Sequence, residues 1–290
     1  MFVALRDLII KHANYPNLFK ALEELGANIL EIRVERDLRP VEYVSGSLRE
    51  SFGISIREVE DWKSFGKCLE DHGYGVCALL SATNFSSEDL ESEAKYLAGV
   101  CKVAYALGVR VVRVDGPKGI IEGYGVEDYV NRTLRGLEGV FKICKDLDIV
   151  LAIENHGLIT NQIEYLRGVL EATDERYFGI TLDTGNFYWY GYPLDEVYEM
   201  YRELAPRVRH THIKNACAPR GKENVRRKPR EVTMAPLYEG DIDLKLLARI
   251  LKEAGYDYDL TVEDESLGRY STDDRKRILA RDVAFLKGLL

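Results

Sequence analysis

The sequence predicts a single (β/α)8 barrel, a TIM barrel of the α/β class, over residues 1–290. Short β-rich runs alternate with amphipathic helical patterns eight times, the order expected of parallel strands joined by helices. A length of 290 residues suits eight such units closed into one barrel. A doubly wound open sheet is the alternative, but no GxGxxG or Walker sequence follows the first predicted strand. No linker or low-complexity tract interrupts the chain, so we expect one domain.

The eight strands are predicted where β-branched and other apolar residues cluster between turn-forming residues. They cover residues 2–6, 28–35, 75–81, 109–115, 149–154, 179–183, 207–214 and 258–263. Helical periodicity predicts helices over 17–25, 59–72, 87–107, 126–147, 161–172, 194–204, 242–254 and 272–289. Glycines are expected to stop several of them, namely Gly26, Gly73, Gly108 and Gly255. Ser86 or Ser87 is the expected N-cap of the third helix and Asp241 that of the seventh.

Alternation along the predicted strands separates apolar residues from charged ones. In the strand at 149–154, Ile149, Leu151 and Ile153 face one side and Glu154 faces the other. In a barrel the apolar side packs on the helices, and polar residues point inward near the C-terminal mouth. The charged residues on the inward side are Glu31, Arg33, Glu35, Arg113, Asp115, Glu154, Asp183, Glu263 and Glu265. Buried charges are costly unless they are paired or bind a metal, so this pattern is typical of an enzyme barrel.

Composition and charge exclude several classes of protein. The net charge of −8 disfavours binding to nucleic acid or to an anionic membrane surface. No apolar run approaches the roughly 18 residues needed to span a bilayer. The N-terminal stretch carries Arg6, Asp7 and Lys11 and does not resemble a signal peptide, so we expect a cytoplasmic protein. Five cysteines without a CxxC pair indicate neither a disulfide framework nor a zinc ribbon.

Four predicted strand ends carry residues able to bind a metal ion: Glu154, Asp183, His212 and Glu263. Glu154, Asp183 and His212 follow one another at a spacing of about one βα unit. A longer segment separates His212 from Glu263. Consecutive strands are neighbours around a barrel, so the four side chains are expected to converge. One imidazole and three carboxylates suit a single Mn²⁺, Mg²⁺ or Co²⁺ ion, with Zn²⁺ as an alternative. Taken singly, each glutamate is more often an ion-pair partner, and either His210 or His212 more often a core histidine.

The second half of the chain resembles the sugar phosphate isomerase/epimerase family, also called the xylose isomerase-like barrels. The matching stretches are Ile153-Glu154-Asn155-His156-Gly157, Leu182-Asp183-Thr184-Gly185-Asn186, His210-Thr211-His212-Ile213-Lys214, Glu239-Gly240-Asp241-Ile242-Asp243 and Val262-Glu263. The resemblance implies that Glu154, Asp183, His212 and Glu263 bind the metal. It also implies an acid/base role for Glu154 and Glu263, which act as a pair in the ketose epimerases of the family.

The chemistry implied by this resemblance is isomerisation or epimerisation of a small sugar-like keto substrate. Removing a proton next to a carbonyl leaves an enediolate, whose oxygens need positive charge, and a metal ion supplies it as a Lewis acid. One glutamate then removes the proton and the other returns it.

Further side chains are candidates to bind the substrate. Arg113, His156, His210 and Lys214 stand at or near strand ends, and Arg113 is equally suited to an ion pair with Asp115. Asn186 and the aromatic run at 187–192, which includes Trp189, follow the strand at 179–183 directly. Aromatic rings at a barrel mouth suit stacking on a sugar, although a lid or a homo-oligomer contact is an equal alternative.

A basic segment, residues 220–230, holds Arg220, Lys222, Arg226, Arg227, Lys228 and Arg230. It lies in the loop after the seventh predicted strand and therefore on the catalytic face of a barrel. An anion clamp for the substrate is one interpretation. A solvated or subunit-contacting loop is the other, and it is the more common use of such a segment.

Three other functions compete with the isomerase. A dehydratase or lyase acting on a keto-sugar or cyclic polyol uses the same metal and base. An apurinic-site endonuclease of the same superfamily needs additional histidine ligands, whereas the chain has five histidines and Asn186 at one expected ligand position. A non-catalytic sugar-binding barrel has no need of paired carboxylates at a metal. Metal analysis of the purified protein separates this binder from the enzymes.

Overall fold

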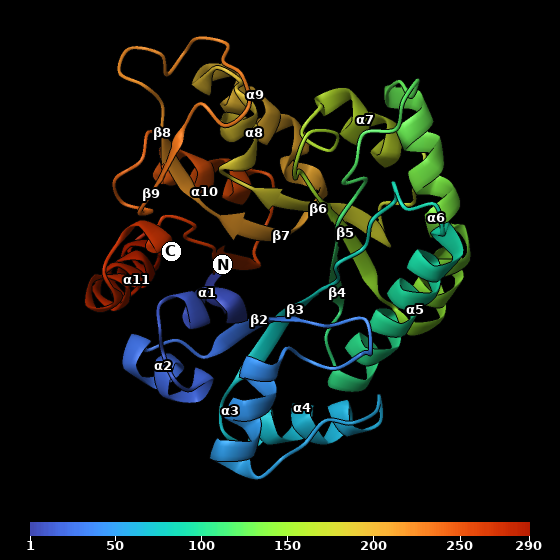
Figure 1. The fold of residues 1–290 in the computed structure, drawn as a ribbon, viewed down its shortest axis with the longest axis vertical. Coiled ribbons are helices and arrows are strands. Elements are labelled where there is room, and N and C mark those ends of the chain that lie inside the picture. Colours follow the sequence, from blue (N-terminus) through green and yellow to red (C-terminus); the bar gives the residue numbers. More distant parts are fainter. The chain divides into compact units, whose positions relative to one another are not determined.

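The computed structural model describes residues 1–290 and contains a closed barrel of eight strands in the order β1-β10-β7-β6-β5-β4-β3-β2 (Figure 1). All the strand pairs recorded within it are parallel. The barrel strands are β1 (Phe2–Arg6), β2 (Ile29–Arg33), β3 (Gly75–Leu80), β4 (Val111–Val114), β5 (Val150–Glu154), β6 (Phe178–Asp183), β7 (Val208–Ile213) and β10 (Asp259–Val262). Each coincides with a strand predicted from the sequence, so the predicted fold class is confirmed.

Eleven α-helices accompany the strands, and eight of them match the predicted ones. These eight are α2 (Leu18–Leu25), α4 (Asp61–Asp71), α5 (Leu90–Leu107), α6 (Val126–Leu147), α7 (Ile163–Glu171), α9 (Leu194–Leu204), α10 (Leu244–Glu253) and α11 (Thr272–Lys287). Three helices were not predicted from the sequence: α1 (Asp7–His12), α3 (Glu42–Phe52) and α8 (Asn186–Tyr190). The 3-10 turns Ala205–Arg207 and Leu267–Arg269 were not predicted either. None of the helices is long and apolar enough to cross a membrane.

Two predicted N-caps are wrong. Helix α5 begins after Asp89, whose carboxylate accepts from the backbone N–H of Ser92, and not after Ser86 or Ser87. Helix α10 begins after Asp243, which accepts from the backbone N–H groups of Lys245 and Leu246. In both places several capping residues lie close together, and the one that reaches the free N–H groups at the start of the helix becomes the cap.

The chain forms two compact units, and the division passes through β2 and β6. The first unit comprises Met1–Ile29 and Leu182–Leu290. Within it β10 pairs with both β1 and β7. A small antiparallel sheet of β8 (Asn215–Cys217) and β9 (Thr233–Ala235) follows β7. Because β8 begins directly after β7, this sheet holds the long segment that leaves the C-terminal end of that strand.

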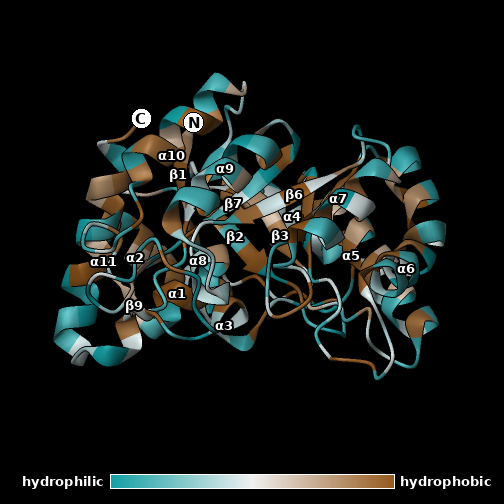
Figure 2. Ribbon diagram, turned by 90° about the horizontal axis from the view of Figure 1, so that it is seen from above, coloured by the Kyte–Doolittle hydropathy of each residue, from teal (hydrophilic) through white to brown (hydrophobic).

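The second unit comprises Leu30–Thr181. Strands β3, β4, β5 and β6 pair in that order within it. The long helices α5 and α6 run side by side on its outside (Figure 1). Hydrophobic residues concentrate in the strands, and the outward faces of the helices are largely hydrophilic (Figure 2). This separation is the one predicted from the alternation of residues along the strands.

A pair of buried carboxyl groups connects α11 to the end of β10. Asp282 of α11 is hydrogen-bonded to Asp264, and its Oδ1 accepts from the backbone N–H of Leu237 at 2.8 Å. Burial and the adjacent Asp264 raise the pKa of Asp282 to about 9. Two like-charged carboxylates cannot share such a site at low cost, so the folded protein keeps a proton there that the unfolded chain releases near pH 4, the usual range of aspartate.

We therefore expect the protein to lose stability as the pH rises from about 5 to about 9. Between the unfolded and folded pKa values of Asp282 the native state binds the extra proton, so the free energy of unfolding falls with increasing pH. Asp282→Asn removes the titrating group and should flatten this dependence, measured as the unfolding midpoint against pH. Asp273→Asn changes an exposed aspartate of the same helix and serves as control. An equally steep fall in both variants would contradict the assignment.

Candidate metal centre

Three of the four predicted metal ligands come together within the first unit. Asp183 ends β6, His212 lies near the end of β7, and Glu263 follows β10 directly. All three side chains are buried, and their ligand atoms lie within 4.8 Å of one another. The Nδ1 atom of His212 is 3.0 Å from Oε2 of Glu263. Strand pairing explains this approach, because His212 aligns with Thr261, two residues before Glu263 on the neighbouring strand.

The local backbone orients the carboxylate of Asp183. Its Oδ1 accepts from the backbone N–H groups of Gly185 and Asn186, each at 2.9 Å. These donors belong to the turn that starts α8, so the end of β6 and the start of the helix hold one side of the carboxylate. The other oxygen, Oδ2, faces the ammonium group of Lys214 at 2.9 Å.

Lys214 is buried among three carboxylates. Its Nζ lies 2.9 Å from Asp183, 3.2 Å from Glu263 and 2.9 Å from Glu265. Burial alone would lower the pKa of Lys214, but the charges of Asp183 and Glu265 outweigh it, and the net shift of this pKa is upward. The backbone of Lys214 is fixed by Thr184, whose hydroxyl donates to its carbonyl and accepts from its N–H. Lys214 therefore remains a cation beside two candidate ligands.

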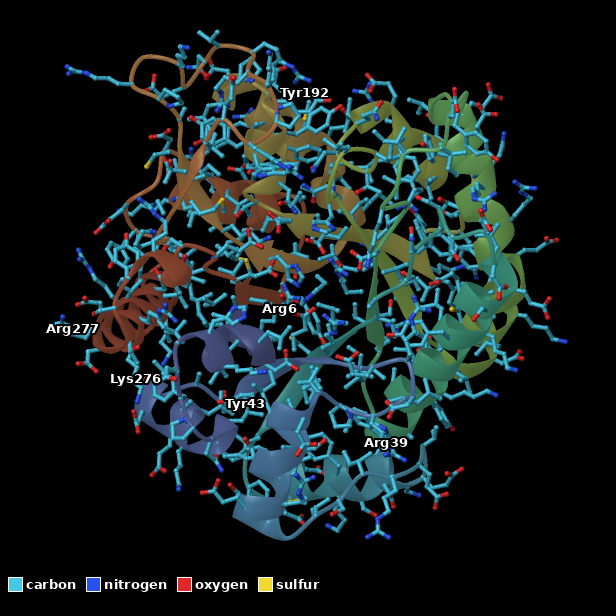
Figure 3. All side chains as sticks on the ribbon, in the orientation of Figure 1. Arg6, Arg39, Tyr43, Tyr192, Lys276 and Arg277 are labelled. Carbon is cyan, nitrogen blue, oxygen red and sulfur yellow. The ribbon has the colours of Figure 1, made fainter.

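Two residues of this cluster were missed in the sequence analysis. The guanidinium of Arg6, at the end of β1, is paired with the carboxylate of Glu263, and Arg6 lies beside β10 (Figure 3). Glu265 reaches Lys214 from the exposed side. The only signal for Arg6 was its position as the last residue of the first predicted strand, which is where barrel enzymes place functional side chains. Alternation along the strand had placed Glu265 on the inward side with Glu263, but it was not predicted as a site residue.

In the second unit, Glu154 stands buried at the end of β5 and is paired with Arg113 of β4. Arg113 also contacts Asp115 at 2.7 Å, which confirms the predicted ion pair. Burial would raise the pKa of Asp115, but Arg113, His156 and Lys118 together lower it strongly. The Nζ of Lys118 lies 2.7 Å from Oδ2 of Asp115. Neither residue was among the predicted site residues.

His156 follows Glu154 by two residues and remains about half exposed. Its Nδ1 is 3.4 Å from Asp115, and its backbone is held by Thr160, which both accepts from the N–H and donates to the carbonyl of His156. The imidazole is therefore anchored on one nitrogen and accessible at the mouth end of β5. Along the neighbouring strand, Glu154 aligns with Thr181, two residues before Asp183.

His210 lies in β7, within the predicted strand 207–214. It is fully buried, and its Nδ1 is hydrogen-bonded to Asp259 at 2.9 Å. Asp259 also accepts from Thr261 and Tyr256. His210 lies two residues before His212 and three before the end of β7. Its hydrogen bonds favour the core-histidine alternative over contact with substrate.

The aromatic run after β6 forms the short helix α8 and the turn that follows it. Asn186 begins the helix and is buried, as are Phe187 and Tyr188, whereas Trp189 and Tyr190 are partly exposed. Arg230 of the basic segment stands over the ring of Trp189, with 5.8 Å from its guanidinium carbon to the ring centroid. Of the two predicted substrate contacts here, Trp189 is therefore reachable from solvent, whereas Asn186 is buried.

Solved structures share this fold across nearly the whole chain. A zinc-bound IolI protein has 16% identity over 98% of this chain and 96% of its own, with a TM-score of 0.69. Mannonate dehydratase from Streptococcus suis has 13% identity over 100% and 93%, with a TM-score of 0.69. The 3-keto-D-glucoside 4-epimerase of E. coli has 12% identity over 97% and 98%, with a TM-score of 0.65. At these identities the likeness concerns the fold alone.

Sequence comparison gives the family. No curated protein sequence matches the chain. The family model of the xylose isomerase-like TIM barrel matches residues 19–289, which include all four candidate ligands and the strands that carry them. The chain therefore belongs to the xylose isomerase-like TIM barrel family.

Proposed function

We propose that the protein is a metal-dependent isomerase or epimerase that moves a proton next to the carbonyl of a sugar or sugar-like substrate. The observation that carries this proposal is the buried group of Asp183, His212 and Glu263, whose ligand atoms lie within 4.8 Å of one another. Membership of the xylose isomerase-like family supports it, as do structural neighbours that include an epimerase, an epimerase-like protein and a dehydratase.

The chemistry of the donor set fits a divalent cation. Carboxylate oxygens and one imidazole nitrogen are suitable ligands for Mn²⁺, Mg²⁺ or Co²⁺, and Zn²⁺ is the alternative that the zinc-bound IolI protein supports. We assign Glu154 as the fourth ligand. The support is strand register. Glu154 of β5 aligns with Thr181 of the neighbouring strand β6. Residues two apart on a strand face the same side, so Asp183 faces the same side of β6 as Thr181.

Asp183, His212, Glu263 and Glu154 would hold the divalent ion, whose positive charge would stabilise the oxygens of an enediolate. The protein itself contributes the proton transfer. We assign Glu154 and Glu263 as the acid/base pair, one removing the proton and the other returning it to the neighbouring carbon or to the opposite face. Arg113 and Arg6 are paired with Glu154 and Glu263, and these ion pairs orient the two carboxylates.

The remaining roles concern binding of the substrate. We assign Lys214, His156, Asn186 and Trp189 to this role, together with Arg113. Lys214 carries a fixed positive charge between two candidate ligands, and His156 presents an exposed ring at the mouth end of β5. The expected substrate is a small sugar-like molecule. A cytoplasmic location and a homo-oligomeric state stay predictions from the sequence.

Exchange of substrate hydrogen with solvent tests the proposal. Metal-loaded protein is incubated in D₂O with a panel of ketoses, inososes and other keto-sugars, and the products are followed by NMR and mass. Deuterium at the carbon next to the carbonyl, with a product isomeric to the substrate, is the expected result. The chelator-treated protein is the control and should show no exchange.

A dehydratase is the second candidate, because the fold is shared with a mannonate dehydratase. It begins with the same proton abstraction, but a hydroxide then leaves, so its product is lighter than the substrate by one water. Metal-loaded protein that catalyses neither exchange nor loss of water across the panel would contradict both functions.

A further inference from the structure

We propose that the loop joining β8 to β9, residues 218–232 and called the basic loop below, binds an anionic group of the substrate. The expected substrates are then sugars that carry a phosphate or a carboxylate at a distance from the reacting carbon. The inference deepens the proposed function and rests on it.

The charge of the basic loop is opposite to that of the protein. It holds six basic and two acidic residues in a chain of net charge −8. Five of the basic side chains are exposed: Arg220, Lys222, Arg226, Lys228 and Arg230. None of these five forms an ion pair with a carboxylate, whereas other exposed arginines such as Arg36, Arg110 and Arg176 do. A cluster of uncompensated positive charge concentrates small anions around it.

The basic loop is held firmly on α8 and the turn after it. The buried guanidinium of Arg227 packs over the ring of Tyr188 at 4.1 Å and donates to the carbonyl of Tyr192 at 2.8 Å. The backbone N–H of Arg227 donates to the carbonyl of Gly191. Gly191 has a φ of +105°, and a Cβ there would collide with the carbonyl of Arg227, so only glycine allows this approach. An anchored loop pays little ordering entropy when it binds a ligand.

Two exposed arginines are presented on aromatic rings. The guanidinium of Arg226 lies 3.9 Å from the ring centroid of Tyr192, which Figure 3 labels beside the loop, and 5.4 Å from that of Tyr190. Arg230 lies over Trp189. Stacking on a ring fixes the plane of the guanidinium and leaves its N–H edges free. Such an edge matches the paired oxygens of a phosphate or carboxylate.

The position of the basic loop relates it to the candidate metal centre. Strand β8, from which the loop starts, begins three residues after His212, and α8, on which it rests, begins three residues after Asp183. Both elements therefore leave the strand ends that carry two of the candidate ligands. Trp189 is six residues from Asp183.

A matched pair of double variants tests the proposal. Arg226→Gln/Arg230→Gln removes the two stacked cations, and Arg249→Gln/Lys252→Gln removes two exposed cations from α10 as the control. Binding of D-fructose 6-phosphate, D-galacturonate and D-fructose to the metal-loaded proteins is measured by calorimetry, with inorganic phosphate as competitor. The phosphate and carboxylate arms show which anion is preferred.

We expect the wild type and the control to bind at least one charged sugar about tenfold or more tightly than fructose, the usual effect of a charge-assisted hydrogen bond. The loop variant should lose this preference, and inorganic phosphate should compete only with the two proteins that have it. Equal binding of charged and neutral sugars by the wild type would overturn the inference, as would a preference that survives in the loop variant.

The D₂O exchange assay separates this result from the proposed function. Exchange on neutral keto-sugars without anion preference leaves the proposed function intact and removes the inference. An anion preference that depends on Arg226 and Arg230, in a protein without exchange on any charged or neutral keto-sugar, supports the anion site and contradicts the proposed function.

Discussion

His212→Ala is expected to abolish tight binding of the divalent ion. The imidazole of His212 is fully buried within reach of Asp183 and Glu263, and it is the only nitrogen ligand assigned to the centre. Loss of a residue that merely supports a metal ligand costs about 10–100-fold in affinity, so loss of a ligand itself should cost about 100-fold or more. Metal content after dialysis, and titration with Mn²⁺ or Zn²⁺, measure the effect.

His210→Ala is the matched control, since His210 is the other histidine of β7 and is equally buried. It should retain the metal. Its expected defect is a lower unfolding temperature, because Asp259 loses its charged or hydrogen-bonded partner inside the strand layer. Metal loss in His210→Ala with normal metal binding in His212→Ala would show that the ligand register along β7 is shifted by two residues.

Glu154→Asp and Glu263→Asp are each expected to lower turnover about 10²-fold or more while the ion stays bound. Aspartate preserves the carboxylate but withdraws it by one methylene, beyond the roughly 3 Å reach of direct proton transfer. A positioned base contributes about 10² to 10⁴ in rate. Turnover and metal content are measured on the same samples, so that loss of the ion is not mistaken for loss of the base.

Solvent exchange refines this second prediction. If the two glutamates act in opposite halves of the transfer, a variant at the abstracting residue should lose exchange and turnover together. The variant at the returning residue should keep more exchange than turnover. Full activity in either metal-loaded variant would show that another group moves the proton, and His156 and Lys214 would then be the first residues to test.

The sequence by itself determined the strands, most of the helices and the positions of the candidate ligands. Period-two alternation is a local property that exists because one face of each strand packs on helices, so it is readable without the fold. The same alternation placed Glu154, Asp183 and Glu263 on the inward side at strand ends. Helix α3 was not predicted because its polar sequence lacks a clear apolar stripe. Helix α8 was not predicted because five residues are too few to show a helical period.

The tertiary structure alone decided which charged groups meet. Arg6 and Glu263 are 257 positions apart in the chain and are brought together by the pairing of β1 with β10. His210 and His212 are indistinguishable by type and parity, and only the buried Asp259 on the neighbouring strand separates a core histidine from a candidate ligand. Ion pairs and rings stacked under arginines depend on distances between segments that are remote in sequence. Residue patterns report which face of an element is buried, but the packing of one element on another determines what that face meets.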